Sequence, residues 1–251
     1  MARHRTSWFL LLFLVLCAGE VAAIGIFGAP QEAETPAIVE DSIVDVRNAN
    51  SAPVNRTPVQ VPVPETAQLA VPFTTQAPHA NWEYPYQEAC EEASALTVHY
   101  FYEGKTFTPD IADREILALV AFEEDELGFY EDTTAAETAR IIKEYWGYTR
   151  VDVLENPTAD QIKAHVAAGR PVIIPASGKE LENPNFRNGG PLYHMFVVTG
   201  YDKDEFITND VGTRKGEDYR YNITTIMNAM HDWNGGDVAN GAKRALVVYD
   251  N

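Results

Sequence analysis

Residues 71–94 read VPFTTQAPHANWEYPYQEACEEAS and contain Cys90. The other cysteine of the chain, Cys17, lies in an N-terminal apolar segment, so Cys90 has no disulfide partner in the body of the protein. A helix is expected to begin at Cys90, because good helix formers follow it and two acids, Glu91 and Glu92, occupy its first turn. A helix start favours the thiolate form of a cysteine, whereas the charges of two adjacent glutamates oppose it. A reactive cysteine at this position therefore needs a cationic partner.

The chain is expected to have three parts. Residues 1–30 combine a basic start, an apolar core and the small residues Val21–Ala23, which is the anatomy of a signal peptide. Apolar residues resume after that run, so the segment is either a cleaved signal or a single retained membrane anchor, and both predict an exported, extracytoplasmic body. Residues 31–70 are rich in proline and predict a linker. Residues 71–251 are long enough to form one domain with a full core.

Composition excludes several classes of function. The chain has 251 residues and a formal net charge of -18, with 37 acids against 19 bases. No basic patch stands out in the sequence, so nucleic acid is not an expected partner. The motifs GxxxxGK, GxGxxG, HExxH and CxxC do not occur, so we expect no nucleotide cofactor and no metal.

Helix-end signals and apolar runs predict an α+β fold in which helices come first and antiparallel strands follow. The expected helices have capping residues at their starts and glycines at their ends. They span residues 90 to about 104, 110–126, 134–146, 158–169 and 225–233. The expected strands span residues 171–176, 194–201, 205–209, 219–221 and 244–249.

A cysteine nucleophile needs a base, and His194 is the best candidate among six histidines because it stands at the start of a strong apolar strand. If a three-residue loop joins this strand to the next, paired residues have numbers that sum to 406. His194 then lies opposite Gly212, and Asp210 is its diagonal neighbour on the same face. Asp210 could accept the imidazole N–H and orient the ring, whereas Asn209 points to the other face. His99 falls on the face of its helix opposite to Cys90.

Each of these residues also has a structural interpretation. A lone cysteine is more often a packed core residue than a nucleophile. A histidine at a strand start is usually structural, and an Asn-Asp pair after a strand usually forms a turn. The order of cysteine at a helix start, histidine at a strand start and aspartate on the partner strand is what favours a thiol enzyme.

Three separated motifs extend this interpretation: VPFTTQAP…NWEYPYQEACEEAS, then PVIIPAS, then YHMFVVTGYD…FITNDVGT. Together they resemble the papain-like cysteine peptidases of the C39-like family, over nearly the whole body and on its free-standing branch. The resemblance implies a papain-like fold, in which a helix carrying the cysteine packs on an antiparallel sheet carrying the histidine and the aspartate. It also implies a triad of Cys90, His194 and Asp210, with Gln76 as an oxyanion-hole donor and Gln87 as the alternative.

The expected activity is therefore hydrolysis of peptide bonds in a peptide or protein substrate outside the cytoplasm. One alternative is an amidase that acts on cell-wall peptides. The other is a papain-like module that binds peptides without cleaving them, which Glu91 favours because many members of the resembled family have glycine after the cysteine. Trp82, Tyr84 and Tyr193 are candidates to line a substrate groove.

Overall fold

The fold is built on one antiparallel sheet in a computed structural model that describes residues 63–251. The expected signal or anchor segment and most of the expected linker lie outside the described residues. The sheet has seven strands in the order β2-β7-β3-β4-β5-β6, and β1 also pairs with β4. The strands are β1 (Ala67–Gln68), β2 (Val151–Glu155), β3 (Val172–Ala176), β4 (His194–Tyr201), β5 (Glu205–Asn209), β6 (Tyr219–Asn222) and β7 (Arg244–Val248).

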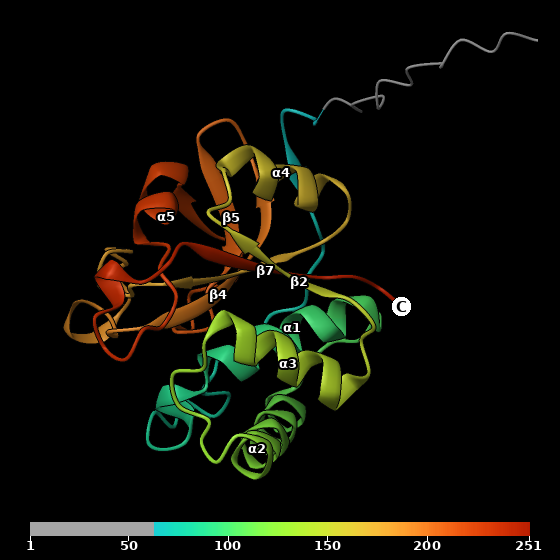
Figure 1. Cartoon of the computed structure of the whole chain (residues 1–251), viewed down its shortest axis with the longest axis vertical. Coiled ribbons are helices and arrows are strands. Elements are labelled where there is room, and N and C mark those ends of the chain that lie inside the picture. The colour runs from blue at the N-terminus through green and yellow to red at the C-terminus, as the bar shows by residue number, and fades with distance from the viewer. Residues whose placement is uncertain (1–62) are drawn as a thin grey trace, which may run out of the picture. The chain divides into compact units, whose positions relative to one another are not determined.

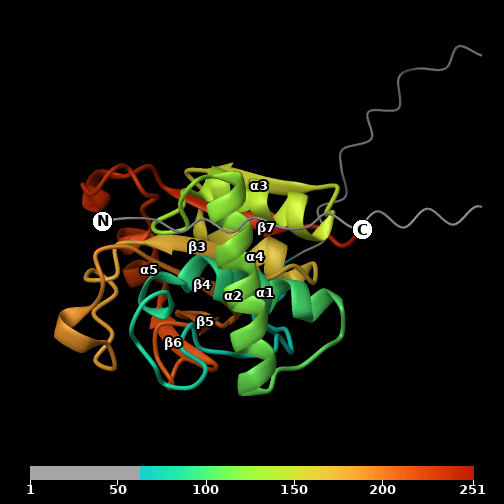
Figure 2. The same ribbon diagram turned by 90° about the horizontal axis from the view of Figure 1, so that it is seen from below.

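Helices cover both faces of this sheet (Figure 1). On one side α1 packs directly against β4, and α2 is the helix farthest from the sheet (Figures 1 and 2). α3 lies beside α1 on the same side, and α4 and α5 cover the opposite side (Figure 1). The helices are α1 (Cys90–Tyr102), α2 (Pro109–Glu126), α3 (Ala135–Trp146), α4 (Ala159–Ala167) and α5 (Ile223–Ala229).

The sequence of the central strand β4 is an almost unbroken apolar run. All eight of its residues are buried, because helices cover both of its faces. Met195 and Val197 join the core under α1, whereas Phe196 and Val198 join the core under α4 and α5. Each large apolar side chain that is fully buried in this way contributes about 1.5–3 kcal/mol relative to an exposed one.

The ends of the helices follow the signals in the sequence. Thr134 and Thr158 form capping boxes at the starts of α3 and α4. Gly147 ends α3 with φ 75°, in the left-handed region that favours glycine. By contrast, Ala89 precedes α1 and supplies no side-chain cap to the N–H groups at the start of the cysteine helix.

The predicted α+β class is confirmed, with three local differences. α5 begins at Ile223, because the Asn222 side chain accepts a hydrogen bond from the Thr224 N–H, and it ends at Ala229. Strand β2 was not expected from the sequence. Strand β1 lies within the range assigned to the linker, so the folded unit reaches back at least to Ala67.

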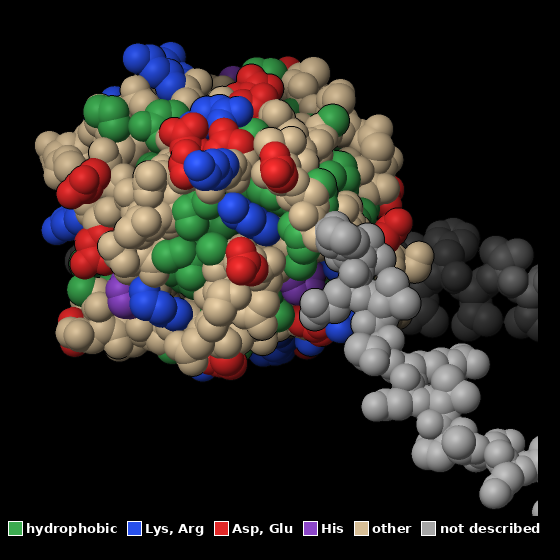
Figure 3. All heavy atoms as spheres, turned by 90° about the horizontal axis from the view of Figure 1, so that it is seen from above, with side chains coloured by type: hydrophobic (Ala, Val, Ile, Leu, Met, Phe, Trp, Pro, Cys, Tyr) green, Lys and Arg blue, Asp and Glu red, His purple; other side chains and the backbone are tan. Residues whose placement is uncertain are grey.

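Acidic, basic and apolar side chains are intermixed on the face over α4 and α5 (Figure 3). Among the described residues, no helix is long and apolar enough to cross a membrane.

Candidate active site

Cys90 is the first residue of α1, and only 5% of it is exposed. Its thiol donates a hydrogen bond to Glu91 Oε2 at 3.0 Å. The Cys90 Sγ in turn accepts a hydrogen bond from the Met195 backbone N–H at 3.3 Å. Because Met195 follows His194 in β4, the predicted nucleophile lies beside the start of the strand that carries the predicted base.

His194 and Asp210 form a buried pair, with 2.8 Å between His194 Nε2 and Asp210 Oδ1. Both side chains are almost completely inaccessible to solvent. Because Asp210 takes Nε2, Nδ1 is the ring nitrogen left to exchange a proton with a thiol. No hydrogen bond joins Cys90 Sγ to His194 within residues 63–251, since the thiol is turned to Glu91.

The predicted pairing of β4 with β5 is present at the end near His194, although a β-bulge helps to produce it. The pair Val197–Asn209 obeys the rule that paired numbers sum to 406. Three residues, 202–204, separate β4 from β5, but the paired numbers next to this turn sum to 407, and a β-bulge around Thr199 restores the sum of 406. Asn209 lies on the other face as expected, where its side-chain amide donates to the carbonyls of residues 71 and 72.

Asp210 accepts hydrogen bonds from other groups besides His194. Its Oδ2 accepts hydrogen bonds from the Tyr221 hydroxyl at 2.5 Å and from Asn183 Nδ2 at 3.0 Å. Its Oδ1 also accepts from the Gly212 N–H at 3.1 Å. Burial opposes ionisation of Asp210, but the charge of His194 and these hydrogen bonds outweigh burial and lower its pKa. Asp210 is therefore an ionised acceptor that fixes the imidazole ring.

Gly212 lets the loop that follows β5 approach the imidazole closely. A Cβ atom at this position would lie 2.7 Å from His194 Cε1 and 3.0 Å from Phe186 Cε1. Real Cβ atoms do not approach other atoms this closely, so any other residue would displace the ring. Phe186 also packs edge-on against His194, with 5.3 Å between the ring centroids.

The helix start does not lower the pKa of the cysteine in this conformation, whereas the expected opposition from Glu91 and Glu92 is present. Burial raises the pKa of the Cys90 thiol well above its usual value, and the Glu91 charge and hydrogen bond raise it further. The Met195 N–H opposes this rise but does not cancel it. The resting cysteine is therefore a neutral thiol.

Three buried glutamates lie on the helices around this thiol: Glu91, Glu92 and Glu123. Burial is the largest cause of the raised pKa of each. The charge of Glu91 raises the pKa of Glu92 and Glu123 further, whereas the charges of Asp132 and Glu88 raise that of Glu91. The pKa rises to about 8 for Glu91 and to about 9 for Glu123. Both carboxyl oxygens of Glu92 are buried without a hydrogen-bond partner among the described residues. These side chains are mostly uncharged acids near neutral pH.

Gln76 is buried and ties the segment before Cys90 to the end of β5. Its Nε2 donates to the carbonyl oxygens of Tyr86 at 2.9 Å and Gln87 at 3.0 Å, and its own N–H donates to the Val211 carbonyl. Exchanging the amide nitrogen and oxygen would set an acceptor against two acceptors, so the orientation is fixed. Both amide protons are thus already bound. The alternative, Gln87, lies on the short 3-10 turn before α1, where its Nε2 donates to Glu88 Oε1 at 3.1 Å.

The other described histidines have different surroundings. His79 is half exposed and forms an ion pair on the surface. His99 stacks on a tryptophan ring far along α1. His165 lies in α4, and His231 Nδ1 donates to the Gly241 backbone carbonyl at 2.8 Å.

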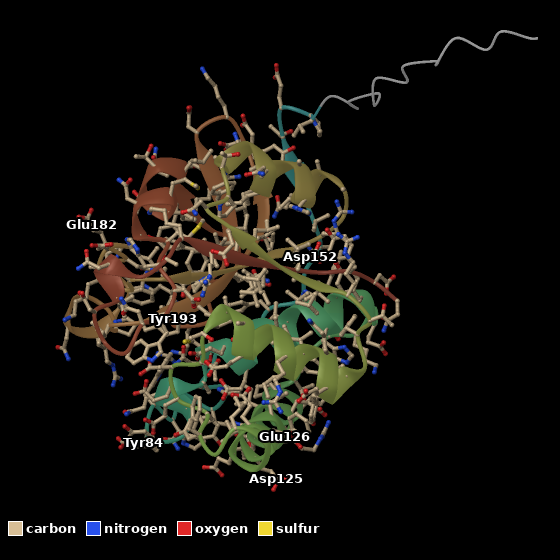
Figure 4. The ribbon with its side chains drawn as sticks, in the orientation of Figure 1. Tyr84, Asp125, Glu126, Asp152, Glu182 and Tyr193 are labelled. Carbon is tan, nitrogen blue, oxygen red and sulfur yellow. The ribbon has the colours of Figure 1, made fainter. Side chains whose placement is uncertain are left out.

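The three aromatic candidates for the groove occupy different positions. Trp82 lines the cleft described below. Tyr193 is buried between the helices and the sheet, where its hydroxyl donates to the Thr133 carbonyl, and Tyr84 is 60% exposed at the edge of the molecule (Figure 4). Asn183 and Tyr221, which hold Asp210, were not singled out from the sequence, because only the folded chain brings their distant segments together.

A cleft of about 670 Å³ opens beside His194. Gln76, Trp82 and Gln87 line it on one side. The loop before β4 and the loop after Asp210 line the rest, through residues 184–188, 190–191 and 212–215. No group of three side chains suited to a metal ion occurs in the part of the chain that the structure describes.

Comparison with known proteins identifies the family. The model of the Peptidase_C39 like family matches residues 68–235, which include the cysteine helix and the strands that carry His194 and Asp210. The chain belongs to the Peptidase_C39 like family. It is thus a papain-like, cysteine-type peptidase at the level of the family, as the sequence motifs predict.

One solved structure supports this fold, and a second was compared with it. A Bacillus anthracis protein assigned to the C39-like peptidases superposes with a TM-score of 0.52 at 16% identity, covering 75% of this chain and 99% of its own. Xylellain, a cysteine protease from Xylella fastidiosa, gives a TM-score of 0.33 at 16% identity, covering 75% of this chain and 87% of its own. No curated protein matches the sequence.

Proposed function

We propose that the chain hydrolyses peptide bonds through Cys90, His194 and Asp210, outside the cytoplasm. The observation that carries the proposal is the Met195 N–H···Sγ contact of 3.3 Å, because it joins the cysteine helix to the strand residue that follows His194. The 2.8 Å pair of His194 and Asp210 supports it, since an oriented imidazole is the base that a thiol requires.

The reaction is acyl transfer in two halves. His194 takes the Cys90 proton at Nδ1 as the sulfur attacks the substrate carbonyl carbon. It then gives that proton to the amide nitrogen as the C–N bond breaks, which releases an amine and leaves a thioester on Cys90. Water, deprotonated by His194, attacks the thioester, and the carboxylic acid and the free thiol are regenerated. Asp210 stays ionised and stabilises the imidazolium formed in each half.

The negative oxygen of the tetrahedral intermediate needs donors. The backbone N–H of Cys90 lies at the start of α1, where no side chain caps the helix. Gln76 is the second donor in this proposal, and it must turn one of its two amide protons away from the carbonyls of Tyr86 and Gln87. Each such donor lowers the activation barrier by on the order of 3 kcal/mol.

Activation also requires the thiol to leave Glu91. In the resting arrangement the thiol proton lies on the hydrogen bond to Glu91 Oε2, and the pKa of the thiol is raised. Substrate in the cleft would turn the sulfur toward Nδ1 of His194. A neutral resting thiol with general-base activation is therefore the proposed mechanism, in place of a preformed thiolate–imidazolium pair.

The substrate and the location are part of the same proposal. The signal or anchor anatomy of residues 1–30 favours a peptide or protein substrate outside the cytoplasm, reached either by a secreted enzyme or by one held on a single N-terminal anchor.

The test uses the full chain, with unfolded casein and purified peptidoglycan as substrates. We expect new N-termini in casein, measured by mass spectrometry, and none in a Cys90→Ala variant. A Cys17→Ser variant is the matched control for loss of a thiol and is expected to cleave casein normally. Release of peptidoglycan fragments alone would favour the amidase, and wild-type cleavage by Cys90→Ala would overturn the proposed mechanism.

A further inference from the structure

The cleft beside His194 is basic, although the protein is strongly acidic. Acids outnumber bases 37 to 19 in the chain. The charged side chains that line the cleft, His194 aside, are Arg187, Arg214 and Lys215, and no aspartate or glutamate lines it. This sign of charge is opposite to that of the whole chain. The face over α4 and α5, by comparison, carries both signs intermixed (Figure 3).

Arg187 is carried by a loop that is built against the site. Its neighbour Phe186 packs on the His194 ring, and the Gly190 N–H donates to the Arg187 carbonyl at 3.0 Å. The same loop holds Asn183, whose amide donates to Asp210 Oδ2. The position of Arg187 is thus coupled to that of the predicted base and its acid. Glu182, in the same loop, lies at the outer edge of the molecule (Figure 4) and does not line the cleft.

Arg214 and Lys215 lie on the tight loop that follows Asp210. The Lys215 N–H donates to Thr213 Oγ1 at 3.3 Å, and the Asp210 N–H donates to the Gly216 carbonyl at 2.9 Å. A Cβ atom at position 216 would lie 1.7 Å from the Asp210 carbonyl oxygen, so only glycine closes the loop this tightly. These contacts fix the backbone of the loop that carries the two cations next to the acid of the site.

The three cations have no ion-pair partner of their own among residues 63–251. Five other arginines of the described chain each pair with at least one carboxylate: Arg114, Arg140, Arg150, Arg220 and Arg244. The side chains of Arg187, Arg214 and Lys215 form no such contact with described residues and are exposed to solvent. Their charge is therefore available to a ligand in the cleft.

The side of the scissile bond follows from the chemistry of His194. This inference rests on the proposed peptide hydrolysis, in which His194 protonates the leaving amine. The half of the substrate that leaves must then lie on the His194 side. The cleft is lined by His194, by the loops before β4 and after Asp210, and by Gln76, Trp82 and Gln87, but not by Cys90. The structure assigns this cleft to the leaving half of the substrate, and the cations select a peptide with acidic side chains just C-terminal to the scissile bond.

The first experiment measures binding without turnover. The probes are two fluorescein-labelled nonapeptide pools, randomised over the first six positions and ending in Asp-Glu-Glu or Asn-Gln-Gln. Full-length Cys90→Ala protein is titrated into each pool, and fluorescence anisotropy gives Kd. We expect tighter binding of the acidic pool, by about two- to fivefold per exposed cation at low salt, with the preference falling as salt rises.

Charge-removing variants decide whether the cleft causes that preference. In the Cys90→Ala background, Arg187→Gln, Arg214→Gln and Lys215→Gln should each reduce it, and the triple variant should abolish it. Lys203→Gln is the matched control, because Lys203 is an exposed cation in the β4–β5 turn, beyond the opposite end of β4 from His194. Equal binding of the two pools, or a preference that survives the triple variant, would overturn the inference.

Cleavage of the same pools by the unaltered Cys90 protein separates the inference from the proposed function. We expect new N-termini enriched in Asp and Glu among wild-type products, and this enrichment should disappear in the triple variant. Cleavage without any charge preference would overturn the inference and leave peptide hydrolysis standing. Absence of cleavage together with a cation-dependent binding preference would support the acidic-peptide site and overturn the peptidase mechanism.

Discussion

Cys90 and Glu91 are neighbours in sequence and partners in space, because the thiol donates to Glu91 Oε2 at 3.0 Å inside the protein. Burial, followed by this carboxylate, raises the pKa of Cys90 well above its usual value. The residue after the predicted nucleophile thus keeps the nucleophile protonated. This contact distinguishes the resting site from one in which the thiolate is already formed.

Replacing Glu91 with glutamine should make Cys90 more reactive. Glu91→Gln removes the carboxylate charge that forms as pH rises through about 8 and that opposes the thiolate. The pKa of Cys90 should therefore fall, and the thiolate fraction rises about tenfold for each unit of that fall. The measurement is the rate of alkylation by iodoacetamide between pH 6 and 10. Glu92→Gln is the graded control, because Glu92 is a smaller cause of the raised pKa of Cys90. An unchanged pH profile in Glu91→Gln would contradict this account of the thiol.

Removing the charge of Asp210 should reduce turnover by on the order of 10³–10⁴-fold, because an asparagine no longer holds the imidazole in the correct tautomer. The milder variant Tyr221→Phe removes the 2.5 Å hydrogen bond that helps to lower the pKa of Asp210, and about a tenfold loss is expected. The acid limb of the pH–rate profile of Tyr221→Phe should also move to higher pH, since Asp210 then protonates at higher pH. Equal kcat/KM for wild type and Asp210→Asn would remove Asp210 from the mechanism.

A single methyl group at position 212 should disturb the site without unfolding the protein. In Gly212→Ala the new Cβ would lie 2.7 Å from His194 Cε1, so the ring must move away from Asp210. We expect a loss of kcat of at least about 100-fold, since misplacement of a reacting group by about 1 Å has that effect. Thermal unfolding is measured alongside, and full activity in a stably folded Gly212→Ala would show that the ring is not held as described.

The buried glutamates predict that the protein is less stable in alkali. Burial raises the pKa of Glu123 to about 9 and that of Glu91 to about 8, so the native state binds more protons than the unfolded state above pH 4.5. The contribution of these two groups to the free energy of unfolding is then highest below about pH 4.5. It is lost as pH rises through about 8 for Glu91 and about 9 for Glu123. Each group contributes a slope of up to about 1.4 kcal/mol per pH unit.

Glu123→Gln tests this linkage directly. The variant should unfold at higher temperature than wild type at pH 9 and show a flatter dependence of Tm on pH. Glu124→Gln, at the exposed next position of α2, is the matched control and should follow the wild-type curve. A wild-type Tm that rises between pH 6 and pH 9 would contradict the buried-acid account.

Local signals predicted much of the fold. The capping boxes at Thr134 and Thr158 and the glycine after α3 each act within one helical turn, so their effect can be read from a few residues. The strand β4 was predicted because both of its faces are buried and its sequence is continuously apolar. Parity along two strands also placed His194 and Asp210 on one face, even though the pairing next to the turn is shifted by one residue.

The remaining features depend on distant contacts. The dipole argument for Cys90 failed because burial and the inward turn of Glu91 are tertiary effects, which a helix start alone does not reveal. Asn183 and Tyr221 reach Asp210 from a loop and an edge strand that no local pattern relates to it. The basic cleft likewise forms only when two loops, each with unremarkable charges, meet beside His194.

The most direct test of the central claim is a double-mutant cycle on Cys90 and His194, with kcat/KM measured on the peptide pool that the wild type cleaves best. Groups that act as one unit give non-additive losses. We predict that Cys90→Ala and His194→Ala each reduce kcat/KM by at least about 10³-fold and that the double variant loses no more than either. Wild-type turnover by His194→Ala, or losses that multiply in the double variant, would contradict a mechanism in which His194 takes the proton of Cys90.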